Sequence, residues 1–163
     1  VTEGKETPMK LANALSQRSE LQERIRQLEG RLLNNAKVQE GESPAEDPQE
    51  LLQELEEDYT QLEDLIARIN RTNSATKVDG VPLSDLLARR ECQKNKLRGL
   101  RDFLDCASEL APRRTLGEIK IRSAVNVREM QKELDRQSKA LRELDEKIQE
   151  ANWTTDLLFL KEK

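Results

Sequence analysis

The sequence predicts an all-α fold: an antiparallel bundle of four long helices with coiled-coil packing, with room for a short β-hairpin or strand in the connections. Two observations support this prediction. Four long segments place mainly apolar residues at alternating steps of three and four, and helix start and stop signals separate them. A step that averages about 3.5 residues keeps one stripe of a helix facing its partner.

The stripes cover residues 11–35, 52–76, 83–107 and 127–158. Most of their positions are apolar, and the few polar exceptions are therefore the places to look for a function. The first stripe consists of Leu11, Ala14, Arg18, Leu21, Ile25, Leu28, Leu32 and Asn35, and the second of Leu52, Leu55, Tyr59, Leu62, Ile66, Ile69, Asn73 and Thr76.

The first two helices have clear start signals. Thr7 followed by Pro8 predicts that the first helix starts at the proline and runs to the loop over residues 39–44. Asp47, Pro48 and Glu50 form a capping pattern that starts the second helix, which we expect to end at about Ala75.

The start and stop signals of the helices are weaker in the second half of the chain. Asp79 and Gly80 predict a tight reversal, after which Ser84 is expected to cap a third helix that ends near Ala111. The alternating residues 118–122 favour a short strand. Asn126 with Glu129 then starts a last helix toward residue 158, so we expect an N-terminal extension over 1–8, one bundle domain over 9–158 and a tail over 159–163.

The composition is that of long helices with a thin core. Charged residues make up 37% of the chain and aromatic residues 2%, so little apolar area is available to one copy and we expect a homo-oligomer. No segment is long and apolar enough for an integral membrane span, and no secretory signal precedes Met9. With two cysteines that lie too far apart on one helix to pair, this favours the cytoplasm.

The charges are distributed unevenly along the chain. Residues 40–58 contain nine acids and no base, whereas residues 89–101 contain six bases and one acid. Pairing between these blocks, within or between copies, is the simplest interpretation. A nucleic-acid surface on 89–101 is the alternative, but the net charge of −4 and the scarcity of aromatic residues favour no nucleic-acid partner.

Most catalytic chemistry is excluded by composition. The chain has no histidine, which removes the commonest general base and metal ligand, and it has no glycine-rich phosphate loop. No Asp or Glu occupies a predicted stripe position, so an all-carboxylate metal site is not expected either. We therefore predict no enzyme, no metal and no cofactor.

The polar exceptions converge when the predicted helices are stacked by layers. Arg18 and Arg90 fall in one layer, with Asp85, Glu150 and Asp156 as candidate counter-charges. One interpretation is that the arginines lay their stems along the stripes and reach water or nearby acids. The other is a polar pocket for an anion or an amide-bearing ligand, whose identity the sequence does not give, lined by Arg18, Asn70, Asn73, Arg90 and Asn152.

Nine short phrases along the chain are specific as a set: Met9–Ala12, Val38–Glu42, Pro44–Pro48, Ile69–Asn73, Leu87–Arg90, Glu118–Lys120, Arg142–Asp145, Ile148–Gln149 and Asn152–Thr154. Together they resemble a family of small, helical, functionally uncharacterised bacterial proteins, some of which carry the name septicolysin. The resemblance runs from Met9 to about Leu158 and implies no settled reaction or binding residues. The name suggests a membrane-active cytolysin, an alternative to the structural or interaction protein that the residues favour.

Overall fold

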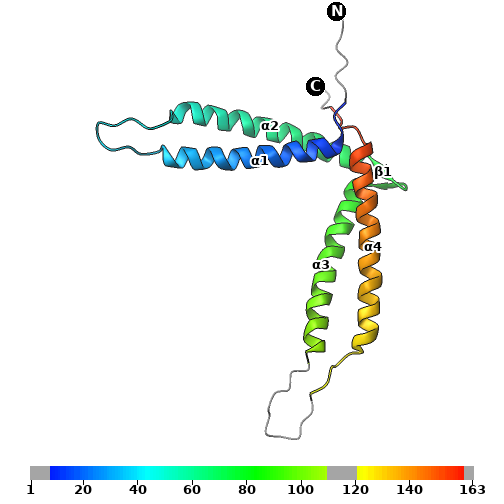
Figure 1. Cartoon of the computed structure of the whole chain (residues 1–163). Helices are drawn as coiled ribbons and strands as arrows, with labels where there is room; N and C mark the ends of the chain where they lie inside the picture. Colours follow the sequence, from blue (N-terminus) through cyan, green and yellow to red (C-terminus); the bar gives the residue numbers. More distant parts are fainter. Residues whose placement is uncertain (1–7, 110–120, 160–163) are drawn as a thin grey trace, which may run out of the picture. The chain divides into compact units, whose positions relative to one another are not determined.

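The computed structural model describes residues 8–109 and 121–159, and most of them are helical (Figure 1). The four helices and the short two-stranded antiparallel sheet confirm the predicted fold class. No helix within these two ranges has the length and apolar character needed to cross a membrane. In chain order, the elements are α1 Leu11–Asn34, α2 Pro48–Ala75, β1 Lys77–Val78, β2 Val81–Pro82, α3 Leu83–Ser108 and α4 Val127–Thr154.

The chain divides into two compact units. The first unit contains the chain up to Lys77 and again from Ala151 onward, and the second unit is Val78–Glu150. The last turn of α4 therefore belongs to the first unit. The expected bounds of the extension, the single domain over 9–158 and the tail stay predictions.

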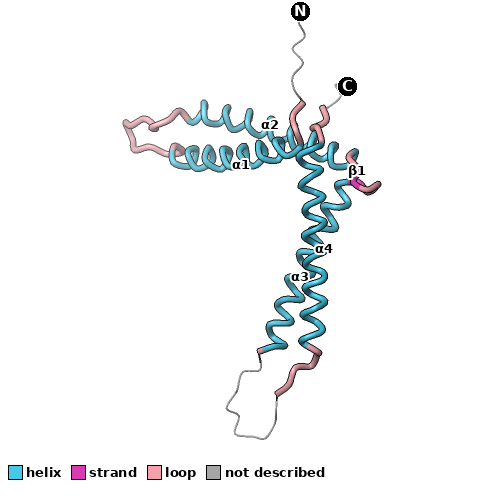
Figure 2. The backbone as a smooth tube through the Cα atoms, turned by 45° about the vertical axis from the view of Figure 1, so that its right-hand side comes forward, coloured by secondary structure: helices cyan, strands magenta, loops and turns pink. Residues whose placement is uncertain are grey.

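The first unit is built on the antiparallel pair α1 and α2 (Figure 2). The stripe of α1 is buried where the sequence predicts it. Asp47 starts α2 as predicted, since its carboxylate accepts a hydrogen bond from the Gln49 N–H at 2.8 Å and Pro48 is the first helical residue. The buried apolar side chains are Leu11, Ala14, Ile25 and Leu28 on α1 and Leu51, Leu62, Leu65 and Ile69 on α2.

The predicted stripe of α2 is partly wrong. Every second predicted residue is exposed or less buried, and the residue just before it is buried in its place. Leu52 and Tyr59 are 48% and 45% exposed, whereas Leu51 and Asp58 are buried. Both frames share Leu55, Leu62 and Ile69, so the same spacing of three and four fits each of them. The observed stripe is Leu51, Leu55, Asp58, Leu62, Leu65, Ile69 and Thr72.

The chain before α1 pairs with the chain after α4, and we call this pairing, of Met9–Leu11 with Thr155–Leu157, the terminal clasp. The Leu11 N–H donates to the Thr155 carbonyl at 2.9 Å, and the Leu157 N–H donates to the Met9 carbonyl at 2.7 Å. Lys10 and Asp156 face each other in an antiparallel bridge, and their side chains form an ion pair of 2.6 Å.

The clasp explains two helix ends that the sequence predicts wrongly. α1 begins at Leu11 rather than Pro8, because Lys10 is extended to pair with Asp156. α4 ends at Thr154 rather than Leu158 for the same reason. Thr7, the predicted cap of α1, lies outside the described residues.

Three further boundaries differ from expectation. α1 ends at Asn34, because the Asn35 backbone and side-chain N–H groups both donate to the Arg31 carbonyl and close the helix. Ser84 is the second residue of α3 rather than its cap, since β2 leads directly into the helix. The last described helical residue of α3 is Ser108, Ala111 and residues 118–120 lie outside the described residues, and residues 121 and 122 form no strand.

The second unit pairs α3 with α4 around a small apolar core. Leu97, Leu104 and Leu134 form its buried centre, with Leu100 and Met130 among the side chains packed against it. The reversal before α3 is confirmed: Asp79 and Gly80 take φ values of 51° and 81°, as a tight hairpin turn between β1 and β2 requires.

A polar contact within the second unit links α4 to the turn before α3. Lys147 of α4 binds Asp79 of the turn at 2.6 Å. The predicted start of α4 is confirmed as well, because the Asn126 side chain accepts a hydrogen bond from the Glu129 N–H at 3.2 Å.

Glu133 on α4 gives a testable pH dependence. It accepts hydrogen bonds from Arg136 at 2.5 Å and Gln137 at 2.6 Å, and these bonds lower the pKa of Glu133 to about 2. Because this folded-state pKa lies below the ordinary value of 4.5, the stabilisation is present above pH 4.5 and is lost as the pH falls toward 2.

We expect an NMR titration of the Glu133 carboxyl to give this low pKa. Arg136→Gln should return the pKa toward its ordinary range, whereas Lys139→Gln, which leaves these bonds in place, should not. An unchanged Glu133 pKa in the Arg136 variant would contradict the assigned cause.

Candidate functional site

Four of the five residues of the predicted polar pocket belong to the first unit. Arg18 on α1 and Asn73 on α2 are half-buried, and Asn70 is exposed. Asn152 is buried in the last turn of α4. Among the described contacts, no hydrogen bond or ion pair joins the side chains of any two of these four residues.

Arg90, the fifth residue, belongs to the second unit. Its guanidinium Nη1 donates to Asp145 Oδ1 at 3.0 Å, so its counter-charge comes from α4 and not from the expected Asp85. Its Nε is buried and has no hydrogen-bond partner among the described residues. Asp156, another expected counter-charge, instead pairs with Lys10. The five-residue pocket stays a prediction.

The most buried charge of the first unit is Asp58, which sequence reasoning missed. Its side chain is 2% exposed in the stripe of α2, and both of its oxygens accept hydrogen bonds from Arg24 of α1. The Nε to Oδ2 distance is 2.7 Å, and the bond to Asp58 raises the pKa of Arg24. This two-bond geometry ties the two helices to one register, because a shift of either helix would leave the carboxylate without its partner.

A sequence signal for this pair existed. Asp58 lies on the alternative frame of α2, four residues before Leu62 and seven after Leu51. An acid on such a stripe needs a basic partner at the same level of the neighbouring helix. Arg24 satisfies this, since it lies beside Ile25 of the α1 stripe.

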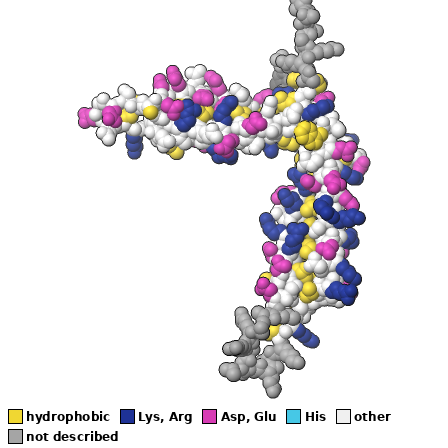
Figure 3. All heavy atoms as spheres, viewed as in Figure 1, with side chains coloured by type: hydrophobic (Ala, Val, Ile, Leu, Met, Phe, Trp, Pro, Cys, Tyr) yellow, Lys and Arg dark blue, Asp and Glu magenta, His cyan; other side chains and the backbone are white. Residues whose placement is uncertain are grey.

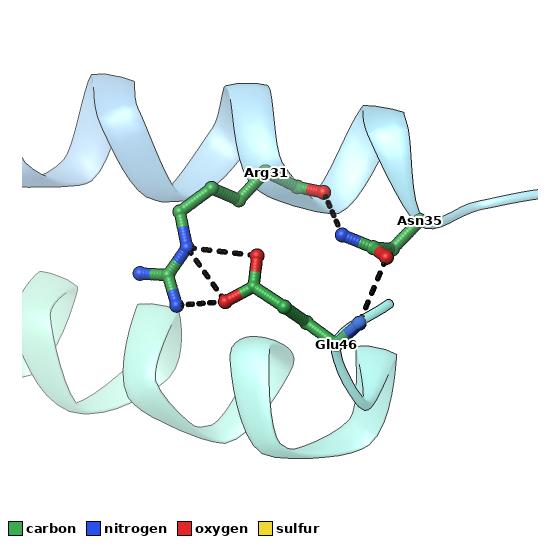
Figure 4. A network of polar contacts seen from close by, with 3 residues as sticks. All are labelled: Arg31, Asn35 and Glu46. Atoms are coloured by element: carbon green, nitrogen blue, oxygen red, sulfur yellow. Dashed lines mark hydrogen bonds and ion pairs between the residues drawn. The ribbon is translucent and has the colours of Figure 1, made fainter. Parts of the chain in front are cut away.

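A second polar network lies where α1 leads into the loop before α2 (Figure 4). Arg31 Nε lies 3.1 Å from both carboxylate oxygens of Glu46, and its Nη2 bonds Oε1 as well. Asn35, which is buried, accepts from the Glu46 N–H at 3.0 Å. The hydrogen bonds from Arg31 lower the pKa of Glu46. Together these contacts fix the loop residue Glu46, just before α2, to the end of α1.

A polar groove of about 780 Å³ runs along α1 and α2 within the first unit. Its two arginines are already engaged: Arg24 binds Asp58, and Arg68 lies 3.6 Å from Asp64 and donates to the Leu158 carbonyl at 3.2 Å. The groove is lined by Gln17, Glu20, Leu21, Arg24, Thr60, Gln61, Asp64, Leu65 and Arg68.

The described residues offer little for metal chemistry. Within 8–109 and 121–159, no three His, Cys, Asp or Glu side chains are grouped so that they could hold a metal ion. Cys92 and Cys106 are both free and exposed on α3. The arrangement is thus one of paired charges between helices, which positions the helices against each other.

The comparisons with known proteins agree, because the solved structure and the family that the chain matches are both of unknown function. A crystal structure described as that of a functionally unknown conserved protein from Corynebacterium diphtheriae shares 43% sequence identity and has a TM-score of 0.85. The match covers 93% of this chain and 100% of that chain. No curated protein matches the chain. The model of a family of unknown function, DUF6847, matches residues 18–157, and the chain therefore belongs to this family.

Proposed function

We propose that the protein is a non-enzymatic structural or interaction protein that works as a homo-oligomer in the bacterial cytoplasm, through coiled-coil contacts between copies. The observation that carries the proposal is the exposure of large apolar side chains on helical faces. Leu52 and Tyr59 on α2 and Phe103 on α3 are each between 45% and 48% exposed. Exposed apolar side chains that follow a helix face are typical of surfaces that pack against another protein.

The thin core supports the same proposal. In the pair α1 and α2, and in the pair α3 and α4, each helix buries one stripe. The apolar side chains on the lateral faces of these helices therefore stay exposed to water when a single copy folds. A further copy would bury these faces and add apolar contact area to each unit. The lack of histidine favours a role without acid–base catalysis.

The resemblance to proteins named septicolysin adds a second candidate, a membrane-active protein. One observation favours it: Trp153 and Phe159 of the first unit are 63% and 64% exposed, and Leu158, which precedes Phe159 in the sequence, is 43% exposed. Aromatic side chains with this exposure suit a membrane surface as well as a protein partner. Arg68, whose guanidinium lies 5.0 Å from the centre of the Phe159 ring, brings a positive charge to the same place.

One sample tests both candidates. We expect sedimentation velocity of the full chain between about 1 and about 100 µM to show a mass above that of one copy that rises with concentration, and native mass spectrometry to give the number of copies. Vesicles loaded with a fluorescent dye, added to the same protein, should retain their dye. A single copy at every concentration would refute the homo-oligomer, and dye release would favour the membrane-active candidate.

A further inference from the structure

One lateral face of α2 carries a row of apolar and acidic side chains. The row keeps steps of four and three residues, as a helix-packing stripe does, but it lies beside the buried stripe rather than on it. Its first four members are exposed and the last is half-buried. We call it the acidic row: Leu52, Glu56, Tyr59, Glu63 and Ile66.

A lateral face of α3 carries a matching row of opposite charge. It keeps steps of three and four residues over six positions, and all six residues are exposed. Its bases are followed by small or apolar residues, and a Cβ placed on Gly99 would meet no atom within 4 Å. We call it the basic row: Arg89, Cys92, Lys96, Gly99, Phe103 and Cys106.

We propose that the acidic row of one copy packs against the basic row of a second copy, with the two helices antiparallel, Glu56 opposite Lys96 and Glu63 opposite Arg89. This inference rests on the proposed function, because it names the surfaces through which the copies assemble. Each chain carries both rows, so each copy supplies either half of the contact.

The spacing of the charges supports this register. Glu56 and Glu63 are seven residues apart, as are Arg89 and Lys96, so one register aligns both pairs at once in either orientation of the helices. Leu52 favours the antiparallel orientation, because the parallel one would place it opposite Asp85. The antiparallel register places Tyr59 within one residue of Cys92, the nearest member of the basic row, whose side chain is small.

The register also accounts for the apolar end of each row. Leu52 falls within one residue of Gly99 and on the side toward Phe103, where the missing side chain of the glycine leaves room for the leucine. Apolar side chains are thus opposed to small or apolar ones, and acids to bases.

The charges of the two rows have few partners within one copy. The side chains of Glu56, Glu63 and Arg89 form no hydrogen bond or ion pair with any residue in the described ranges. Lys96 lies near enough to Glu133 to help lower the pKa of that carboxyl.

Figure 3 shows basic side chains gathered along the pair α3 and α4. A partner with acids at a spacing of seven residues would complement this surface, and α2 of a second copy has them.

Paired charge reversals test the contact. In variant A, Glu56→Lys and Glu63→Lys make both rows basic. In variant B, Arg89→Glu and Lys96→Glu make both rows acidic. Each variant alone should assemble at least about tenfold more weakly than the unchanged protein, because like charges would face each other. An equimolar mixture should recover assembly, since every row then finds a row of opposite charge.

Matched controls separate the rows from net charge. Glu40→Lys with Glu42→Lys reverses two exposed acids of the loop before α2, and Arg128→Glu with Lys132→Glu reverses two exposed bases of α4. Neither control touches a row, so both should assemble as the unchanged protein does. Far-UV circular dichroism of every variant shows whether the helices are kept.

The orientation is tested by one reversal in each row. Both reversals are placed in the same chain, so that no unchanged row is left to pair. Glu56→Lys with Lys96→Glu should assemble as the unchanged protein does, whereas Glu56→Lys with Arg89→Glu should not, and the opposite result would overturn the antiparallel register.

Three outcomes decide the contact itself. If the unchanged protein assembles and variants A and B assemble equally well, the rows are not the interface and the contact is refuted while the proposed function stands. If A and B are weakened but their mixture does not recover, the pairing of the two rows is refuted. If the unchanged protein is a single copy at all concentrations, the proposed function itself fails.

Discussion

Replacing Arg24 with methionine should lower the free energy of unfolding by about 1–3 kcal/mol, because the buried Asp58 carboxylate then loses both of its hydrogen bonds. The Arg24 side chain is itself half exposed, so water compensates part of the loss and the effect stays below that of a fully buried pair. Urea unfolding followed by circular dichroism at one protein concentration measures the change.

The double variant makes this prediction specific to the pair. Arg24→Met with Asp58→Leu replaces both charges by apolar side chains and should return to within about 1 kcal/mol of the unchanged protein, or exceed it. Arg26→Met is the control, since Arg26 pairs with Glu23 on the exposed side of α1 and should change little. An Arg24 variant as stable as the Arg26 variant would show that Asp58 does not depend on its partner.

Leu157→Ala should lower the free energy of unfolding by about 2–4 kcal/mol, because this side chain of the terminal clasp is 2% exposed. Its neighbour Leu158 is 43% exposed and supplies a matched control, since Leu158→Ala removes the same atoms from a position that is largely in water. Both variants keep the backbone bonds of the clasp.

Hydrogen exchange distinguishes the clasp from the rest of the first unit. In Leu157→Ala, the Leu11 and Leu157 amides, which donate across the clasp, should exchange faster, whereas amides in the middle of α2 should change less. Equal loss of stability in the two leucine variants would mean that the burial of Leu157 contributes little.

Local signals in the sequence predict most of the fold. Asp47 before Pro48, Asp79 before Gly80 and Asn126 before Glu129 each act within about four residues, and the structure confirms all three. The stripes of α1 and α3 are also buried as predicted, since each of these helices has one apolar frame.

The frame of α2 could not be chosen from α2 alone. Tyr59 is more apolar than Asp58, so composition favours the frame that contains the tyrosine. The structure takes the other frame, in which Arg24 of α1 meets the carboxylate and Tyr59 donates to Glu29 at 3.0 Å instead. The choice of frame depends on the neighbouring helix α1. Because the sequence of α2 alone does not give that frame, the charge pair between Arg24 and Asp58 was not predicted.

The terminal clasp was equally invisible to local patterns, and it has a consequence for how the chain folds. α1 and α2 are consecutive in sequence, so their pairing needs only a short loop to close and should be fast. Lys10 and Asp156, by contrast, are separated by 146 positions. On the ribosome, the helical hairpin of the first unit can therefore form early, before the clasp residues Thr155–Leu157 have been synthesised. The hairpin is made before the second unit and its clasp only after it, so a nascent chain carries this hairpin without its clasp while Val78–Glu150 is synthesised.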